Sequence, residues 1–126
     1  MGFSMQHVAL FVGPLVCALA VGAGAFGAHG LAERLDERAL ALWETAARYM
    51  MYGGLGLTLL GIVGRQWPRP GFEGAAWTLL LGTVVFSGTV AALALGGPRW
   101  LGAVTPLGGL LLIAGFLLFA WTALKM

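Results

Sequence analysis

Two ionisable residues, Glu44 and Arg48, stand four positions apart in a segment with helical periodicity, the acid first. This order favours an ion pair on one helix face. Charged groups beside an apolar helix are costly and are often functional. Two interpretations therefore stand: an ion pair that fixes the depth of the helix at a membrane surface, or part of a polar path. Tyr49 is adjacent and belongs to the same group of candidates.

His29 is a second candidate, because Glu33 follows it by four residues and a helix would place both on one face, as in some metal sites. The sequence supplies no third ligand nearby. His7 lies at the opposite end of the same apolar segment, and Cys17, the single cysteine, lies within it. We therefore expect a hydrogen-bonded histidine at a membrane surface and predict no metal and no cofactor. A metal or haem site is the alternative.

Hydroxyl groups form a third set, at Thr83, Ser87, Thr89 and Thr105. In lipid such groups bond across to neighbouring helices or line a polar path, and bonding between helices is the expected role. The Thr105 hydroxyl can also bond a carbonyl that Pro106 leaves without a donor. Ser87 and Thr105 are kept as candidates for contact with lipid or a partner.

The sequence contains no arrangement that pairs a nucleophile with a base. There is no Gly-x-Ser-x-Gly elbow, no phosphate-binding glycine loop and no carboxylate cluster. An enzyme acting on lipid, with His29 as its base, is a hypothesis that lacks a nucleophile or a metal set. We therefore predict that the protein is not an enzyme.

The segments that must position these groups are long and free of charge. Residues 1–32, 49–64, 74–98 and 100–124 contain no Asp, Glu, Lys or Arg. Charged residues make up 10% of the chain and hydrophobic residues 60%, with a mean hydropathy of +0.90. A soluble domain carries about 25% charged residues. The sequence therefore predicts an all-α fold, an integral membrane bundle of four transmembrane helices.

The 126 residues are predicted to form a single transmembrane domain. Its predicted spans are about 5–28, 40–64, 74–96 and 101–123. Asp36 is the expected N-cap of the second helix, which continues an amphipathic face that begins at Leu31. This helix is longer than the hydrocarbon core of about 30 Å, so its first turns protrude or it bends at Gly53-Gly54.

The first span is rich in small residues. Ala18 with Gly22, and Ala20 with Gly24, have the four-residue spacing that lets helix backbones approach closely in lipid. Pro14 is expected to bend this span, because proline cannot donate to the helical ladder. The segment lacks the basic lead-in of a signal peptide, so we expect it to be a retained span.

The net charge of +2 does not indicate nucleic-acid binding, because the seven basic residues are scattered along the chain. In a membrane protein they act as an orientation signal. The side that holds both termini would carry Arg65, Arg69 and Lys125, and the other side Arg34, Arg38 and Arg99, with Arg48 near it. The two sides carry nearly equal numbers of basic residues, so the rule barely separates the two orientations. We expect both termini in the cytoplasm.

Four blocks of the sequence resemble, in order, those of a known family. They are Gly24-Ala-Phe-Gly-Ala-His-Gly-Leu31, Trp43-Glu-Thr-Ala46 with Tyr49, Leu81-Gly-Thr-Val-Val-Phe-Ser-Gly-Thr89, and Thr105-Pro-Leu-Gly-Gly109 with Ala114-Gly-Phe116. Together they resemble the YgdD-like proteins, a family of small inner-membrane proteins of unknown function. The resemblance implies four spans and a multi-pass protein of the bacterial inner (cytoplasmic) membrane, and it implies no activity.

This chain departs from the family pattern at one position. Members of the family usually have a histidine four residues after the tyrosine, where this chain has Gly53. A metal-binding or proton-relaying histidine at that position is therefore excluded here. The departure favours a structural role for the second span.

Two functions from different classes remain. The leading one is a non-enzymatic structural or accessory component, which packs in the lipid bilayer with itself as a homo-oligomer or with the subunits of a larger membrane complex. Its basis is the surplus of small residues. The alternative is a small transporter or channel with polar groups at Glu44, Arg48 and His29.

Overall fold

The computed structural model describes residues 5–126, and these form four long helices. They are α1 (Met5–Phe26), α2 (Glu37–Gln66), α3 (Pro70–Ala94) and α4 (Leu101–Leu124); a π-helical segment, η1 (Gly27–Leu31), continues α1. All four are long and apolar enough to cross a membrane. No strand occurs between residues 5 and 126. The predicted all-α fold with four transmembrane helices is confirmed.

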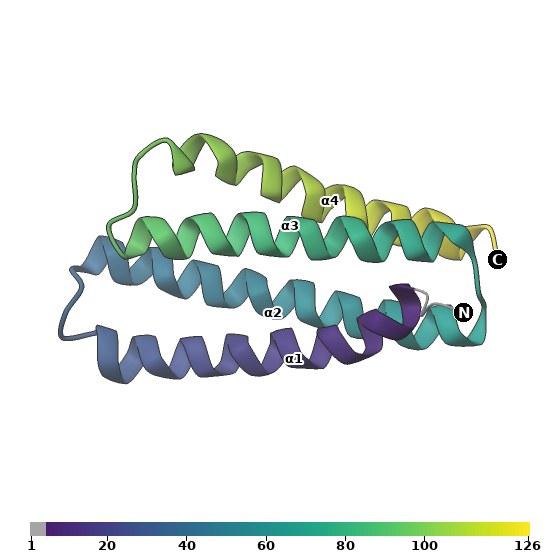
Figure 1. The fold of residues 1–126 in the computed structure, drawn as a ribbon, viewed down its shortest axis with the longest axis horizontal. Helices are drawn as coiled ribbons and strands as arrows, with labels where there is room; N and C mark the ends of the chain where they lie inside the picture. The colour runs from purple at the N-terminus through teal and green to yellow at the C-terminus, as the bar shows by residue number, and fades with distance from the viewer. Residues whose placement is uncertain (1–4) are drawn as a thin grey trace.

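The helices are arranged as an antiparallel row (Figure 1), in which each packs mainly on its neighbours in the chain. α2 and α4 barely touch, and α1 and α4 make no contact within the described part of the chain. The expected bundle is therefore open along one side. The start of α1 and the C-terminus lie at one end with the α2–α3 turn, which we call the terminal end; residues 32–36 and 95–100 form the opposite, loop end.

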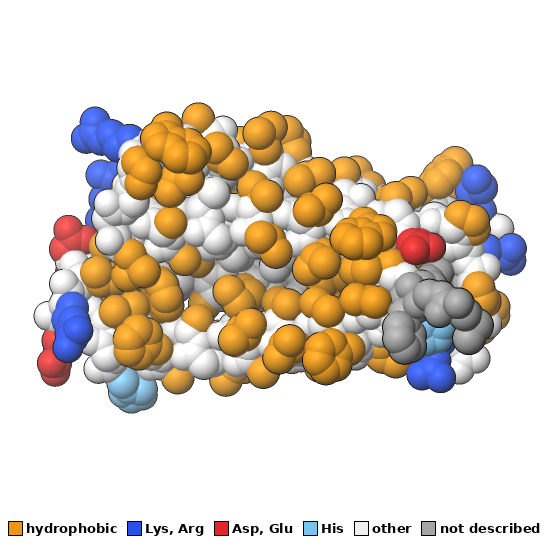
Figure 2. Space-filling model, in the orientation of Figure 1, with side chains coloured by type: hydrophobic (Ala, Val, Ile, Leu, Met, Phe, Trp, Pro, Cys, Tyr) orange, Lys and Arg blue, Asp and Glu red, His pale blue; other side chains and the backbone are white. Residues whose placement is uncertain are grey.

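The surface is divided as a membrane requires. On the face that Figure 2 shows, charged side chains gather at the two ends of the molecule, and hydrophobic side chains cover the long middle. α2, with 30 residues, is about 45 Å long at 1.5 Å per residue. It exceeds the hydrocarbon core of about 30 Å and forms one continuous helix through Gly53 and Gly54. Its ends therefore protrude.

Local sequence signals explain where the helices begin and end. Asp36 caps α2 as predicted, since its Oδ1 accepts a hydrogen bond of 2.8 Å from the Ala39 amide. Pro70 occupies the first turn of α3, where it needs no donor. α3 ends in a Schellman motif: Gly96 has φ 93°, and the Gly97 amide donates to the Ala92 carbonyl at 2.7 Å.

One predicted continuation is wrong. The amphipathic face expected from Leu31 onward is interrupted, because residues 32–36 form a turn and the helix restarts at Glu37. The first helical segment instead runs through η1 to Leu31, beyond the expected end at residue 28.

Close packing rests on different glycines from those predicted. A Cβ on Gly54 would lie 3.0 Å from the Gly13 carbonyl oxygen, and one on Gly61 would lie 2.7 Å from the Leu10 amide. Gly22 and Gly24 have no atom within 4 Å of an added Cβ. The two glycines of the predicted Ala18–Gly22 and Ala20–Gly24 pairs therefore make no close contact, whereas Ala20 itself is buried.

The first turns of α1 incline across α2 towards α3 (Figure 1). Met5 and Ala9 are buried there against Phe72 and its neighbours, and the Met5 amide donates to Glu73 Oε1 at 3.3 Å. The bend agrees with the position of Pro14 inside α1.

Candidate functional site

Arg48 lies on the outward face of α2, in line with Tyr52, Leu55 and Leu59, which are each about half exposed. Glu44 is also exposed, one turn nearer the loop end. No ion pair joins Glu44 to Arg48 among residues 5–126, so the predicted pairing is absent. An exposed arginine thus stands without an acidic partner among residues 5–126, on a face that continues with exposed apolar and aromatic side chains.

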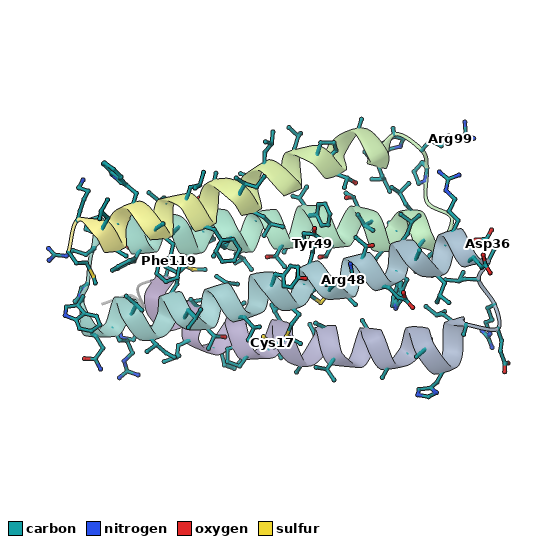
Figure 3. The ribbon with its side chains drawn as sticks, turned by 180° about the vertical axis from the view of Figure 1, so that it is seen from behind. Cys17, Asp36, Arg48, Tyr49, Arg99 and Phe119 are labelled. Carbon is teal, nitrogen blue, oxygen red and sulfur yellow. The ribbon has the colours of Figure 1, made fainter. Side chains whose placement is uncertain are left out.

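Along the helix axis, Arg48 lies well away from the loop end of the molecule. Gly53 of α2 packs directly against Thr83 of α3, and a Cβ on Gly53 would overlap the Thr83 hydroxyl. Measured from that contact towards the loop end, Arg48 is about 7.5 Å away and the end of α3 at Ala94 about 16 Å. Figure 3 places Arg48 and Tyr49 correspondingly within the length of α2. The arginine must extend its side chain towards the headgroups to remain hydrated.

A groove runs between α2 and α4 over α3, because α2 and α4 barely touch. Arg48 does not line it, but the next residue in the chain, Tyr49, does. Its volume is about 340 Å³. Tyr49, Tyr52 and Phe86 form one side; the α4 side consists of Gly109, Leu112, Ile113 and Phe116. The Tyr49 ring lies 4.7 Å from that of Phe86 and 5.1 Å from that of Tyr52, between centroids. Neither tyrosine hydroxyl has a hydrogen bond within the described structure.

His29 is exposed within η1, and Glu33 lies in the turn that follows. The two therefore do not share one regular helix face. The part of the chain that the structure describes holds no group of three His, Cys, Asp or Glu side chains that could bind a metal ion. Neither His29 nor Glu44 lines the groove.

The hydroxyl candidates have three different fates. Thr89 and Thr105 bond to each other across α3 and α4, with 2.6 Å between their oxygens, as expected for hydroxyls in lipid. Thr105 also donates to the Leu101 carbonyl, whereas the carbonyl that faces Pro106 belongs to Gly102. The Thr105 hydroxyl therefore does not bond the carbonyl that Pro106 leaves without a donor, and that expectation is wrong.

Thr83 bonds within its own helix, and the Ser87 hydroxyl has no partner in the described structure. Thr83 donates to the Leu79 carbonyl at 2.7 Å. Ser87 is 1% exposed, and its Oγ has no hydrogen-bond partner in the described structure. Because Ser87 follows Thr83 by one turn, it lies on the same α2-facing side of α3 and not at the protein surface. The prediction that Ser87 contacts lipid directly is therefore wrong.

Trp43 was not among the candidate residues, yet it fixes the loop end of α1. Its indole N–H donates to the Ala23 carbonyl at 2.8 Å, and its ring packs edge-on against Phe26. A Cβ on Gly27 would lie 2.6 Å from the Trp43 ring. Gly27, the second glycine of the Gly-Ala-Phe-Gly-Ala-His-Gly block, thus leaves the space that this tryptophan ring occupies. Gly27 and Trp43 both stand in the sequence blocks that resemble a known family, and this was the sequence signal for their contact.

The terminal end carries further basic groups around two shallow cavities. One of about 400 Å³ includes Arg65, Arg69 and Glu73 in its lining. The other, of about 470 Å³, is bordered by Arg69 and Lys125, and the Lys125 ammonium lies 5.5 Å from the centre of the Trp121 ring. Cations and tryptophan at this level are typical of a membrane–water interface.

Comparison with known proteins gives one family. Residues 23–109 match the family described as Protein of unknown function (DUF423). A UPF0382 membrane protein of Staphylococcus haemolyticus is 44% identical over 116 residues, covering 92% of this chain and 94% of the relative. The UPF0382 membrane protein YwdK of Bacillus subtilis is 36% identical over 121 residues, covering 95% and 98%. No solved structure matches the chain.

Proposed function

Because this chain belongs to the DUF423 family of UPF0382 membrane proteins, a family of unknown function, we propose that it is a non-enzymatic component that packs through α1 with a second membrane helix. That helix comes from another copy or from a larger membrane complex. The protein resides in the inner (cytoplasmic) membrane, since spanning proteins of the outer-membrane type are barrels. The four blocks named above also support a place among the YgdD-like proteins.

The outer face of α1 carries this proposal. Ala18, Gly22 and Ala25 are exposed there at helical spacing, and an added Cβ on Gly22 meets no atom within 4 Å. Small residues at this spacing are what transmembrane helix interfaces use. Since α1 touches no part of α4, this face is left open by the fold. The surface is therefore suited to a close helix–helix contact outside the chain.

The transport alternative gains no comparable support. His29, Glu44 and Arg48 are all exposed, and the groove between α2 and α4 is lined mainly by apolar and aromatic side chains. A polar path would need such groups to meet inside the protein.

The test replaces Gly22 with leucine, which fills the exposed small face without touching the interior. In mild detergent the wild-type protein should elute as an oligomer or co-purify with a crosslinked membrane partner, and Gly22→Leu should lose at least half of that species. Size-exclusion chromatography with light scattering measures it.

Gly88→Leu is the matched control, because Gly88 is also exposed with open space around it but lies on α3. It should keep the wild-type assembly. A wild-type monomer without a crosslinked partner, or equal behaviour of the two variants, would overturn the proposal.

A further inference from the structure

We propose that the groove between α2 and α4 binds one acyl chain of an anionic phospholipid, with the phosphate of the headgroup held by Arg48. This lipid site is separate from the outer face of α1. It does not depend on the partner proposed above.

The groove has the chemistry of an acyl-chain site. Leucine, isoleucine and aromatic side chains line nearly all of it, and Gly109 leaves its floor open on α4. Tyr52 and Ile113 are 47% and 58% exposed, so the groove opens sideways into the bilayer. A hydrocarbon chain can therefore enter from the lipid without crossing a polar barrier.

The size of the groove argues against a helix from a second copy. One turn of helix with side chains, about 10 Å across and 5.4 Å long, occupies roughly 420 Å³. The groove holds about 340 Å³. Part of one flexible acyl chain fits this space, whereas a full helical turn exceeds it.

Arg48 supplies the charge that selects the lipid. It lies one helical turn from Tyr52 on the same face, towards the loop end, where headgroups would be. Its guanidinium has no ion-pair partner among residues 5–126, and guanidinium binds phosphate through paired hydrogen bonds. The free hydroxyls of Tyr49 and Tyr52 are further donors. Glu44, one turn beyond Arg48, is the nearby charge that opposes an anion.

The experiment is native mass spectrometry of the full chain in detergent, with phosphatidylglycerol and phosphatidylcholine of the same acyl composition added in turn. The wild type should retain phosphatidylglycerol at least several-fold better. Arg48→Gln should remove that preference, and Glu44→Gln should strengthen it. Arg34→Gln is the matched control, because Arg34 is an exposed arginine in the turn of the same end and should leave the preference unchanged.

A second variant tests the chain site independently of charge. A Cβ on Gly109 would lie 3.7 Å from the Phe86 ring, an ordinary contact, so we choose Gly109→Leu to fill the groove. It should lower retention of both lipids while the thermal transition stays cooperative. Equal retention of the two lipids by the wild type, or equal loss in Arg48→Gln and Arg34→Gln, would overturn the proposal. So would a dimer that only Gly109→Leu dissociates, since a second copy would then occupy the groove.

Discussion

At the scale of single residues, Trp43 connects the end of α1 to α2 through one hydrogen bond and one ring contact. The Ala23 carbonyl that it binds lies one turn before η1, where the helix changes from α to π geometry. Such local widening is rare and needs support from its surroundings. The tryptophan provides that support from the neighbouring helix.

Trp43→Phe should therefore destabilise the protein while keeping most of the ring packing. The lost hydrogen bond is worth about 1 kcal/mol. Unfolding in mixed detergent micelles, followed by circular dichroism, measures the difference. Trp77→Phe is the control, because Trp77 is 52% exposed on α3 and should cost less. An equal loss in both variants would show that the hydrogen bond contributes nothing.

The sequence identified some site residues and not others, for physical reasons. Thr105 was found because a hydroxyl in an apolar helix needs a partner, and Thr89 supplies it. Ser87 was also selected by its type, but residue type does not reveal which side of α3 faces α2. The groove beside Tyr49 depends on how far α2 stands from α4, and no local pattern encodes that distance.

At the scale of helices, glycine decides how closely the elements approach. A Cβ on Gly82 of α3 would lie 2.7 Å from the Leu112 amide and 3.1 Å from the Gly108 carbonyl oxygen of α4. Backbone atoms cannot rotate away as a side chain can. The contact of α3 with α4 therefore requires glycine at this position.

Gly82→Ala should force α3 and α4 apart and lower the free energy of unfolding by about 1–3 kcal/mol. Gly88→Ala, where an added Cβ meets open space, should be neutral or slightly stabilising, since alanine favours helix. Thermal denaturation of both variants in the same detergent makes the comparison. A stable Gly82→Ala protein would contradict the close approach of the two backbones.

The number and type of elements were predictable because a charge-free, apolar run of about 20 residues is typical of a transmembrane helix. The choice of packing glycines was not. The pattern of small residues in the first span is real, but Gly22 faces outward while Gly13 meets α2. The spacing of small residues identifies a helix face that another helix can approach closely. Only the fold shows whether that other helix belongs to the same chain.

At the scale of the whole molecule, the two ends carry nearly equal positive charge. The terminal end holds Arg65, Arg69 and Lys125, and the loop end holds Arg34, Arg38 and Arg99, with Arg48 further in. Orientation in the membrane follows the difference between such sets. With so small a difference, one additional charge has unusual leverage.

We expect both termini in the cytoplasm, and a single lysine should shift that orientation. Ala32→Lys adds charge to the exposed turn at the loop end and should raise the fraction of chains with external termini. A cysteine added after Met126, with Cys17 replaced by alanine, reports this fraction through labelling of spheroplasts by an impermeant maleimide. Gln66→Lys, at the opposite end, should lower it. No response to either lysine would exclude charge balance as the determinant.

The tightest backbone contacts lie inside the pairs α1–α2 and α3–α4. Gly54 meets Gly13 in the first pair, and Gly82 meets Gly108 and Leu112 in the second. During translation, each half therefore acquires its own closest neighbours as soon as its second helix leaves the ribosome. Residues 67–69 then divide a nascent chain that can enter the bilayer as two successive hairpins. The joining of α2 to α3, and of the first turns of α1 to α3, is left to follow.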